Sequence, residues 1–134
     1  MSQVIVYTQD DGGVAVCTPT GELPIEEVLA RDCPPGAIII DDSALPQGAG
    51  AQFYDAWELN GTTITVNFDK AKVERMAEFN QVALIVAQKR QANTLIGIPN
   101  VPDDTIFMAQ ITTGRNGITT ATTLDELVAI INPT

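Results

Sequence analysis

Histidine is absent from the 134-residue chain, and cysteine is limited to two residues. Without histidine the chain cannot form a serine–histidine or cysteine–histidine pair, cannot bind a metal through imidazole and lacks the commonest general base. The two thiols, Cys17 and Cys33, cannot complete a four-ligand zinc site unless carboxylates help. A small hydrolase would have only carboxylates to work with. We therefore expect a protein that is not an enzyme and that holds no metal and no cofactor.

Basic residues are scarce, with seven Lys and Arg against 17 Asp and Glu, and the net charge is −10. Residues 1–69 carry eleven acids and one base, Arg31, whereas residues 70–134 carry six of each. Such an acidic half repels nucleic-acid phosphates and anionic lipid, because both bind proteins through Lys and Arg. We expect no nucleic acid and no membrane among the partners. The acidic half is either a solubilising surface or a polyanion mimic that occupies a basic protein.

Long hydrophobic runs are also missing. The N-terminal "MSQVIVYTQDDGG" has no basic region and only a four-residue apolar run, so it does not read as a signal peptide. No apolar run approaches the ~20 residues that cross a bilayer. We therefore expect a cytoplasmic protein, with Cys17 and Cys33 as reduced, small hydrophobic residues.

Two pairs of acids, Asp10-Asp11 and Asp41-Asp42, are the only candidate cation ligands that the pattern suggests. They could bind a divalent cation through oxygen if they met at adjoining strand ends. Paired acids in turns more commonly favour the turn itself and solubility, and we prefer that interpretation.

The first half of the chain reads as a small β-rich unit. Residues 4–8 and 14–18 are β-branched runs on either side of "QDDGG", which predicts a hairpin. A short helix is expected over residues 24–31, and "AIIIDD" predicts a third strand. "SALPQGAGAQ" is expected to be a loop.

The segment "YDAWELNGTTITVNFDKAK" predicts a second hairpin, with strands over residues 53–59 and 62–68. Its Asn60-Gly61 pair suits a type I′ turn. Ile64, Val66 and Phe68 alternate with polar residues, so one face should be buried. We expect the only tryptophan, Trp57, on that inner face or at the rim with its indole N–H bonded.

The second half reads as helical. A helix of about 27 residues should begin after an Asp69 N-cap and end at Gly97. A shorter helix over residues 103–113 should be broken by Gly114 and Gly117. A final amphipathic helix should follow a Thr122 or Thr123 cap and cover residues 124–131.

These elements predict an α+β fold of order β-β-α-β-β-β, followed by a long helix and a short C-terminal helix. We place an acidic β-rich unit at residues 1–68 and a helical unit at 69–134. The long helix is apolar nearly all round at its centre, which indicates burial on more than one side. We therefore expect a homo-oligomer or a hetero-complex. The candidate partner-binding residues are Phe79, Val82, Ile85, Val86, Leu124, Leu127, Val128 and Ile131.

The order of these segments resembles a family of small tailed-bacteriophage proteins. The resemblance rests on "VIVYTQDDGGVAVCTP", "PPGAIIIDDSALP", "FYDAWELNGTTITVNFDKAK", the long helix and the Arg115 segment that leads to "TTLDELVAIINP". The chain is similar to proteins that are encoded beside tail-fibre genes and are described as tail fibre assembly or tail assembly chaperone proteins. The layout spans nearly the whole chain, although "GRNGI" around Arg115 departs from the more helical, Arg-rich stretch of the family.

The resemblance implies a non-enzymatic protein that binds a phage structural protein. It would act as a tail-fibre or tail assembly factor, or as a small virion subunit of the tail or the fibre attachment, in the bacterial cytoplasm or in the virion. The alternative, from the acidic first half, is a phage-encoded inhibitor of a host defence complex.

Overall fold

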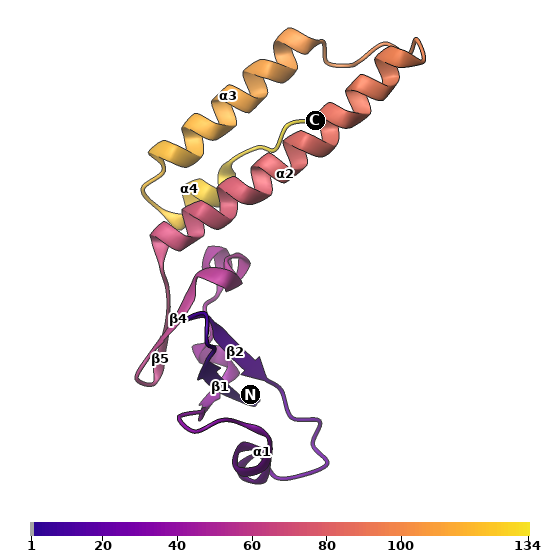
Figure 1. Cartoon of the computed structure of the whole chain (residues 1–134). Coiled ribbons are helices and arrows are strands. Elements are labelled where there is room, and N and C mark those ends of the chain that lie inside the picture. The colour runs from indigo at the N-terminus through magenta and orange to yellow at the C-terminus, as the bar shows by residue number, and fades with distance from the viewer. Residues whose placement is uncertain (1) are drawn as a thin grey trace. The chain divides into compact units, whose positions relative to one another are not determined.

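The computed structural model describes residues 2–134 and contains two compact units, Met1–Ala71 and Lys72–Thr134 (Figure 1). Within residues 2–134 it has two small antiparallel sheets and four α-helices, in the order that the sequence predicts. The predicted α+β fold is confirmed. The division between the units falls in the first turn of the long helix.

The first sheet has the strand order β2-β1-β3, with both neighbours antiparallel to the central strand. Its strands are β1 Gln3–Thr8, β2 Val14–Cys17 and β3 Ile38–Asp41. Along β1, Val4 and Val6 face one side and Ile5 the other, and all three are buried. The helix α1, Ile25–Asp32, packs against β1 and β3. The sheet is therefore covered on both faces.

The second sheet is the predicted hairpin, with β4 at Trp57–Asn60 and β5 at Thr63–Val66. Asn60 pairs with Thr63, so the two-residue turn consists of Gly61 and Thr62, not of Asn60 and Gly61. Gly61 has φ +65°, and no non-glycine residue in the part of the chain described has positive φ. The predicted type I′ turn is wrong, because it needs positive φ at both central residues; one positive φ at the first fits type II′.

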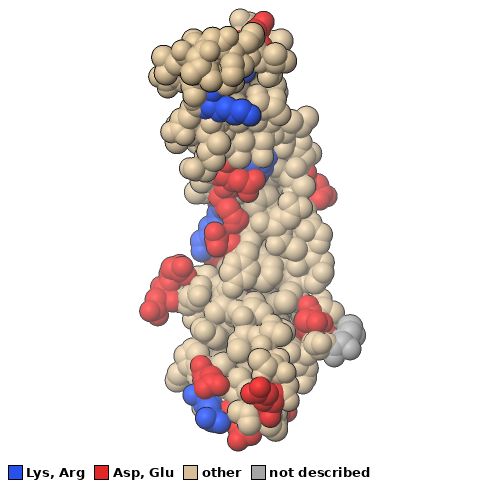
Figure 2. All heavy atoms as spheres, turned by 90° about the vertical axis from the view of Figure 1, so that its right-hand side faces the viewer, with Lys and Arg blue, Asp and Glu red and all other residues tan. Residues whose placement is uncertain are grey.

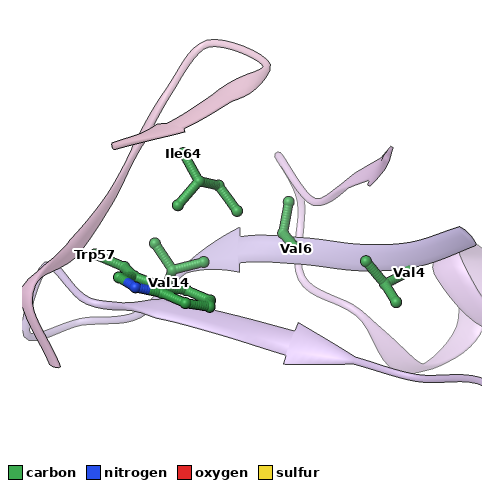
Figure 3. Close-up of a cluster of buried hydrophobic side chains, with 5 residues drawn as sticks. All are labelled: Val4, Val6, Val14, Trp57 and Ile64. Atoms are coloured by element: carbon green, nitrogen blue, oxygen red, sulfur yellow. The ribbon is translucent and has the colours of Figure 1, made fainter. Parts of the chain in front are cut away.

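The hairpin covers the face of the first sheet that carries Val4 and Val6. In Figure 3 the Ile64 side chain reaches from the hairpin toward the first sheet, and Val14 lies at the Trp57 ring; these three residues form one buried cluster with Val4 and Val6. The Trp57 indole N–H donates to the carbonyl oxygen of Gly50 over 2.9 Å. That oxygen belongs to the 3₁₀ helix Gly48–Gln52, inside the segment predicted as a loop. The inward position of Trp57 is confirmed.

The long helix α2, Phe68–Leu95, begins before the predicted Asp69 N-cap. Its N-cap side chain belongs to Asn67, whose Oδ1 accepts from the Lys70 N–H at 3.1 Å, and not to Asp69. Its end matches the prediction, because Gly97 has φ +78°. Ile98 N–H donates to the Asn93 carbonyl and Gly97 N–H to that of Thr94, which is a Schellman motif.

The helix α3, Asp104–Thr120, continues through Gly114 and Gly117. The prediction that these glycines break the helix is wrong. At Gly114 the Phe79 ring leaves no room for a Cβ, and at Gly117 a Cβ would meet the end of the flexible Ile130 side chain. The glycines thus permit close packing, and the tertiary contacts outweigh their low helix propensity of about 1 kcal/mol each.

The final helix α4, Leu124–Ala129, is shorter than predicted and has Thr123 as its N-cap. Thr123 Oγ1 accepts from the Glu126 N–H at 3.2 Å, and Glu126 in turn accepts from the Thr122 hydroxyl at 2.9 Å. In Figure 1, α2 and α3 run antiparallel side by side, and α4 lies along the first half of α2.

Candidate functional site

The predicted partner-binding residues do not form one surface. Phe79 and Leu127 are fully buried inside the helical unit and are therefore core residues of that unit. Val82, Val86 and Leu124 are half-buried. The remaining three, Ile85, Val128 and Ile131, expose a third or more of their surface. These exposed residues remain candidates for binding a partner.

A buried arginine holds α4 and the chain end against α2. Arg75, which is 5% exposed, donates from Nε to the Leu127 carbonyl oxygen at 3.1 Å. Its Nη2 donates to the Ile130 carbonyl oxygen at 2.9 Å and to Asn132 Oδ1 at 2.8 Å. These acceptors include carbonyl groups at the C-terminal end of α4, where a cation is favoured. From the sequence alone, a scattered basic residue such as Arg75 is expected on a solvated face or in an ion pair, and its burial is not predicted.

An apolar groove lies between α3 and the chain end. Its volume is ≈ 560 Å³, and none of the residues that line it is charged. Ile106 and Ala109 of α3 form one wall, and Ile130 and Ile131 form the other. Ile131 is 82% exposed even though it lies at this groove. The groove is thus a concave surface with the composition of a protein-binding site.

The connection between α2 and α3 carries a second apolar surface, which we call the apolar tip. It consists of the exposed side chains of Leu95, Ile96, Ile98 and Val101. Residues 91–102 contain no charged side chain. Figure 2 shows mostly uncharged surface at this end of the helical unit. The sequence predicts only the end of the long helix in this segment, and the uncharged run is the signal that could have identified the surface.

A second cavity, of ≈ 370 Å³, contains the other buried arginine of α2. Arg90 Nη2 lies 2.8 Å from Asp104 Oδ1, and the guanidinium carbon lies 4.6 Å from the centre of the Phe107 ring. The Asp104 side chain is 85% exposed. From the sequence, Arg90 is expected on a solvated face or in an ion pair; the ion pair is present, but the burial is not predicted. Its burial follows from stacking on Phe107, which only the pairing of α2 with α3 brings about.

The acidic pairs of the first unit act in turns. Asp11 Oδ1 accepts from the Gly13 N–H at 2.8 Å, and Asp41 Oδ1 accepts from the Ser43 N–H at 3.0 Å. The bond from the Ser43 backbone holds the pKa of Asp41 below its ordinary value. Within residues 2–134, no group of three or more Cys, Asp or Glu side chains is arranged to hold a metal ion.

Charge is divided unequally between the units. Residues 1–71 carry eleven acids and two bases, and residues 72–134 carry six acids and five bases. Acidic side chains are spread over the N-terminal unit in Figure 2. None of the helices within residues 2–134 has the length and apolarity that a membrane span requires. The surfaces most suited to a partner therefore lie on the nearly neutral helical unit.

Comparison of the chain with protein-family models, with curated proteins and with solved structures gives no match in any of the three.

Proposed function

We propose that this is a non-enzymatic bacteriophage protein that binds a phage structural protein. It would serve either as a tail-fibre or tail assembly factor, acting in the bacterial cytoplasm, or as a small subunit of the tail or fibre attachment in the virion. The identity of the partner class comes from the resemblance described above. The observation that carries a binding function is the exposed apolar surface of the helical unit.

The apolar tip supports this proposal most directly. Val101 is 88% exposed, and Leu95, Ile96 and Ile98 are each at least half exposed. Each large apolar side chain left in water forgoes about 1.5–3 kcal/mol of burial free energy. Contiguous surfaces of this kind mark interaction sites in folded proteins. The near-neutral charge of residues 72–134 lets the tip approach a partner without strong repulsion.

Affinity purification from phage-infected bacteria tests the proposal. We expect one phage structural protein to co-purify with the tagged chain. The Ile96→Asp, Val101→Asp double variant should lose that protein while remaining folded. The control is Gln88→Asp with Thr112→Asp, which adds the same charge at two other exposed positions. Failure of any phage protein to co-purify would contradict both the assembly and the virion role.

Quantitative mass spectrometry of purified virions separates the two roles. Stoichiometric copies would identify a structural subunit, and absence would identify an assembly factor. Light scattering of the isolated protein reports whether it forms a homo-oligomer, as we propose, or assembles only with a partner protein. A 14.3 kDa monomer that is unchanged by added tail proteins would contradict both forms of assembly.

The acidic N-terminal unit favours a second candidate, an inhibitor of a host defence complex. With eleven acids against two bases in residues 1–71, it could occupy a basic, nucleic-acid-binding protein. Such binding weakens steeply as salt rises, because the charges are screened. Binding through the apolar tip should be nearly independent of salt. A salt titration of the captured complex therefore distinguishes the two candidates.

A further inference from the structure

The Arg90 cavity is separate from the groove beside α4. Arg90 and Gln91 of α2 and Phe107 and Met108 of α3 line the cavity, and none of the residues around it also lines the groove. The groove is lined by α3 and residues 129–132, whereas the cavity is lined by α2, α3 and Asn100. None of the residues that line the cavity belongs to α4 or the chain end.

The guanidinium of Arg90 has unused hydrogen-bonding capacity. Arg90 is 7% exposed, and one of its nitrogens bonds to Asp104 Oδ1. Arginine has five N–H donors in a rigid fork. Within residues 2–134 no second protein acceptor bonds to this guanidinium. A cation that is more than nine-tenths buried thus lines the cavity, and most of its donors bond to no protein oxygen within residues 2–134.

The other buried arginine of α2 indicates what such donors bind. Arg75 has one exposed carboxylate partner, Glu78, as Arg90 has Asp104. Arg75 also donates to three neutral oxygens, the carbonyls of Leu127 and Ile130 and the side-chain amide of Asn132. Those acceptors belong to the end of a helix and the uncharged segment that follows it. The corresponding acceptors are missing at Arg90.

We propose that the Arg90 cavity binds a neutral, apolar peptide segment of another protein. The carbonyl oxygens of that segment accept hydrogen bonds from the Arg90 guanidinium. An apolar side chain of the segment packs on Phe107 and Met108. This inference rests on the proposed function only in that a phage structural protein would supply the segment.

The local charge favours a neutral ligand. Asp104 already balances Arg90, and no second basic residue lines the cavity. An incoming carboxylate or phosphate would meet one acid and one cation that is already paired. A backbone carbonyl meets no such repulsion, and a hydrogen bond from a charged donor to it is stronger than one from a neutral donor.

The wall of the cavity is preorganised. Thr94 Oγ1 and Asn100 Nδ2 both donate to the backbone carbonyl of Arg90, at 3.1 and 3.2 Å. These bonds tie the last turn of α2 to the residues that follow it. The arginine therefore starts from a fixed backbone, which lowers the entropy lost on binding.

A second copy of this chain is not the source of the segment. The chain's own helix end and uncharged tail are already bound at Arg75, and Leu127 is fully buried there. Supplying them to another molecule would expose that core. A different protein with an uncharged segment of similar chemistry meets no such cost.

The test is an NMR titration of the labelled full-length protein with the neutral peptide N-acetyl-Leu-Val-Ala-Ile-amide. We expect saturable shifts of the Arg90 Nε–Hε signal and of the Met108 methyl signal. Arg90→Gln should weaken binding about tenfold or more, because it removes a hydrogen bond from a charged donor. Met108→Lys leaves the arginine in place and should also weaken it about tenfold. The control Ile106→Lys, on the same helix at the groove, should bind within about twofold of the unaltered protein.

Three results would overturn the proposal. The first is the absence of a saturable shift at Arg90 up to the solubility limit of the peptide. The second is equal or stronger displacement of the same signals by sodium acetate, which would assign the cavity to carboxylates. The third is a shift of the same signals when the protein concentration is raised without peptide, which would assign the cavity to a second copy of the chain. None of these depends on a phage partner, so the proposed function can fail or hold independently.

Discussion

Gly114 of α3 lies directly against the ring of Phe79 of α2. A Cβ placed on Gly114 would stand 2.2 Å from Phe79 Cε2 and Cζ, well inside van der Waals contact. Phe79 is fully buried, and Gly114 is buried as well. The two helices can approach this closely only because one of them has no side chain at the crossing. The Phe79–Gly114 contact therefore sets the spacing of the helical hairpin.

We expect Gly114→Ala to destabilise the protein. The added methyl group collides with a buried ring, and overpacking of this kind costs about 1–3 kcal/mol. The gain in helix propensity of about 1 kcal/mol offsets only part of it. Urea unfolding monitored by circular dichroism measures the difference. Phe79→Leu in the same chain should recover part of the loss, since it removes the ring atoms that collide.

Gly117→Ala is the matched control for that prediction. Its Cβ would lie 2.5 Å from Ile130 Cδ1, the far end of a side chain that can rotate. The same gain in helix propensity applies. We expect a free energy of unfolding within about 1 kcal/mol of the original protein. Equal destabilisation by both substitutions would refute the special role of the Phe79 contact.

Gly61→Val should weaken folding through backbone strain alone. Gly61 has φ +65°, and no atom lies within 4 Å of the position of an added Cβ. A β-branched residue forced into this region costs about 1–3 kcal/mol. Thr62→Val is the control, because the neighbouring turn residue does not have positive φ. Thermal unfolding should separate the two variants; similar melting temperatures would contradict the assignment of strain.

Trp57→Ala should be among the most damaging changes in the N-terminal unit. The ring is 6% exposed and lies in the cluster with Val14 and Ile64, so its removal should cost about 3–5 kcal/mol. Trp57→Phe keeps most of the packing and removes the indole donor, but the Gly50 carbonyl still accepts from the Phe53 N–H at 3.3 Å. The loss should therefore be that of one hydrogen bond, about 0.5–1.5 kcal/mol. Tryptophan fluorescence checks the burial. An emission maximum typical of a fully exposed indole would contradict it.

Arg75→Gln should release α4 and the chain end. The substitution removes the charged hydrogen bonds that Arg75 donates to the Leu127 and Ile130 carbonyls, and we expect a loss of about 2–4 kcal/mol. Hydrogen exchange should become faster for the amides of α4 in particular. Glu78→Gln removes only the exposed member of the ion pair and should change stability by less than about 1 kcal/mol. Comparable effects of the two changes would argue against the carbonyl contacts.

The Glu58–Lys70 pair predicts a contribution to stability that is lost in acid. A hydrogen bond from Lys70 and a second from Asn67 hold the pKa of Glu58 below its ordinary value of 4.5. Because the pKa of Glu58 is lower in the folded protein, the ionised carboxylate stabilises the fold above pH 4.5. This contribution is lost as the pH falls through the folded pKa. The stability difference between the original protein and Glu58→Gln should therefore shrink below pH 4.5. Urea unfolding across this pH range measures the stability difference. The difference between the original protein and Lys70→Met should shrink over the same range, because this variant removes the Lys70 hydrogen bond.

Much of the fold could be predicted because the signals are local. The alternation of Ile64 and Val66 with threonines predicts a strand with one buried face, and a glycine after a long apolar helix predicts its cap at Gly97. The Thr123 cap follows from the same kind of reasoning. Each of these features depends on residues within a few positions of one another.

The misjudged elements are those in which a distant residue competes with a local preference. Gly114 and Gly117 have low helix propensity, and nothing nearby in the sequence reveals Phe79 or Ile130 beside them. The observed turn, at Gly61 and Thr62, lies one residue after the predicted one. The register of the β4–β5 pair determines its position, and the Asn-Gly dipeptide does not. Propensity is a weak term that packing overrides.

The sequence by itself determined the element types, the acidic first half and the apolar character of α2. Only the tertiary structure decided which apolar side chains are core and which are surface. Phe79 and Leu127 are buried, whereas Ile131 and Val101 are exposed, although all four belong to apolar stretches. It also decided that Arg75 and Arg90 are buried. The physical reason is that burial depends on which segments meet in space, and pairwise contacts across 50 residues leave no periodic trace along the chain.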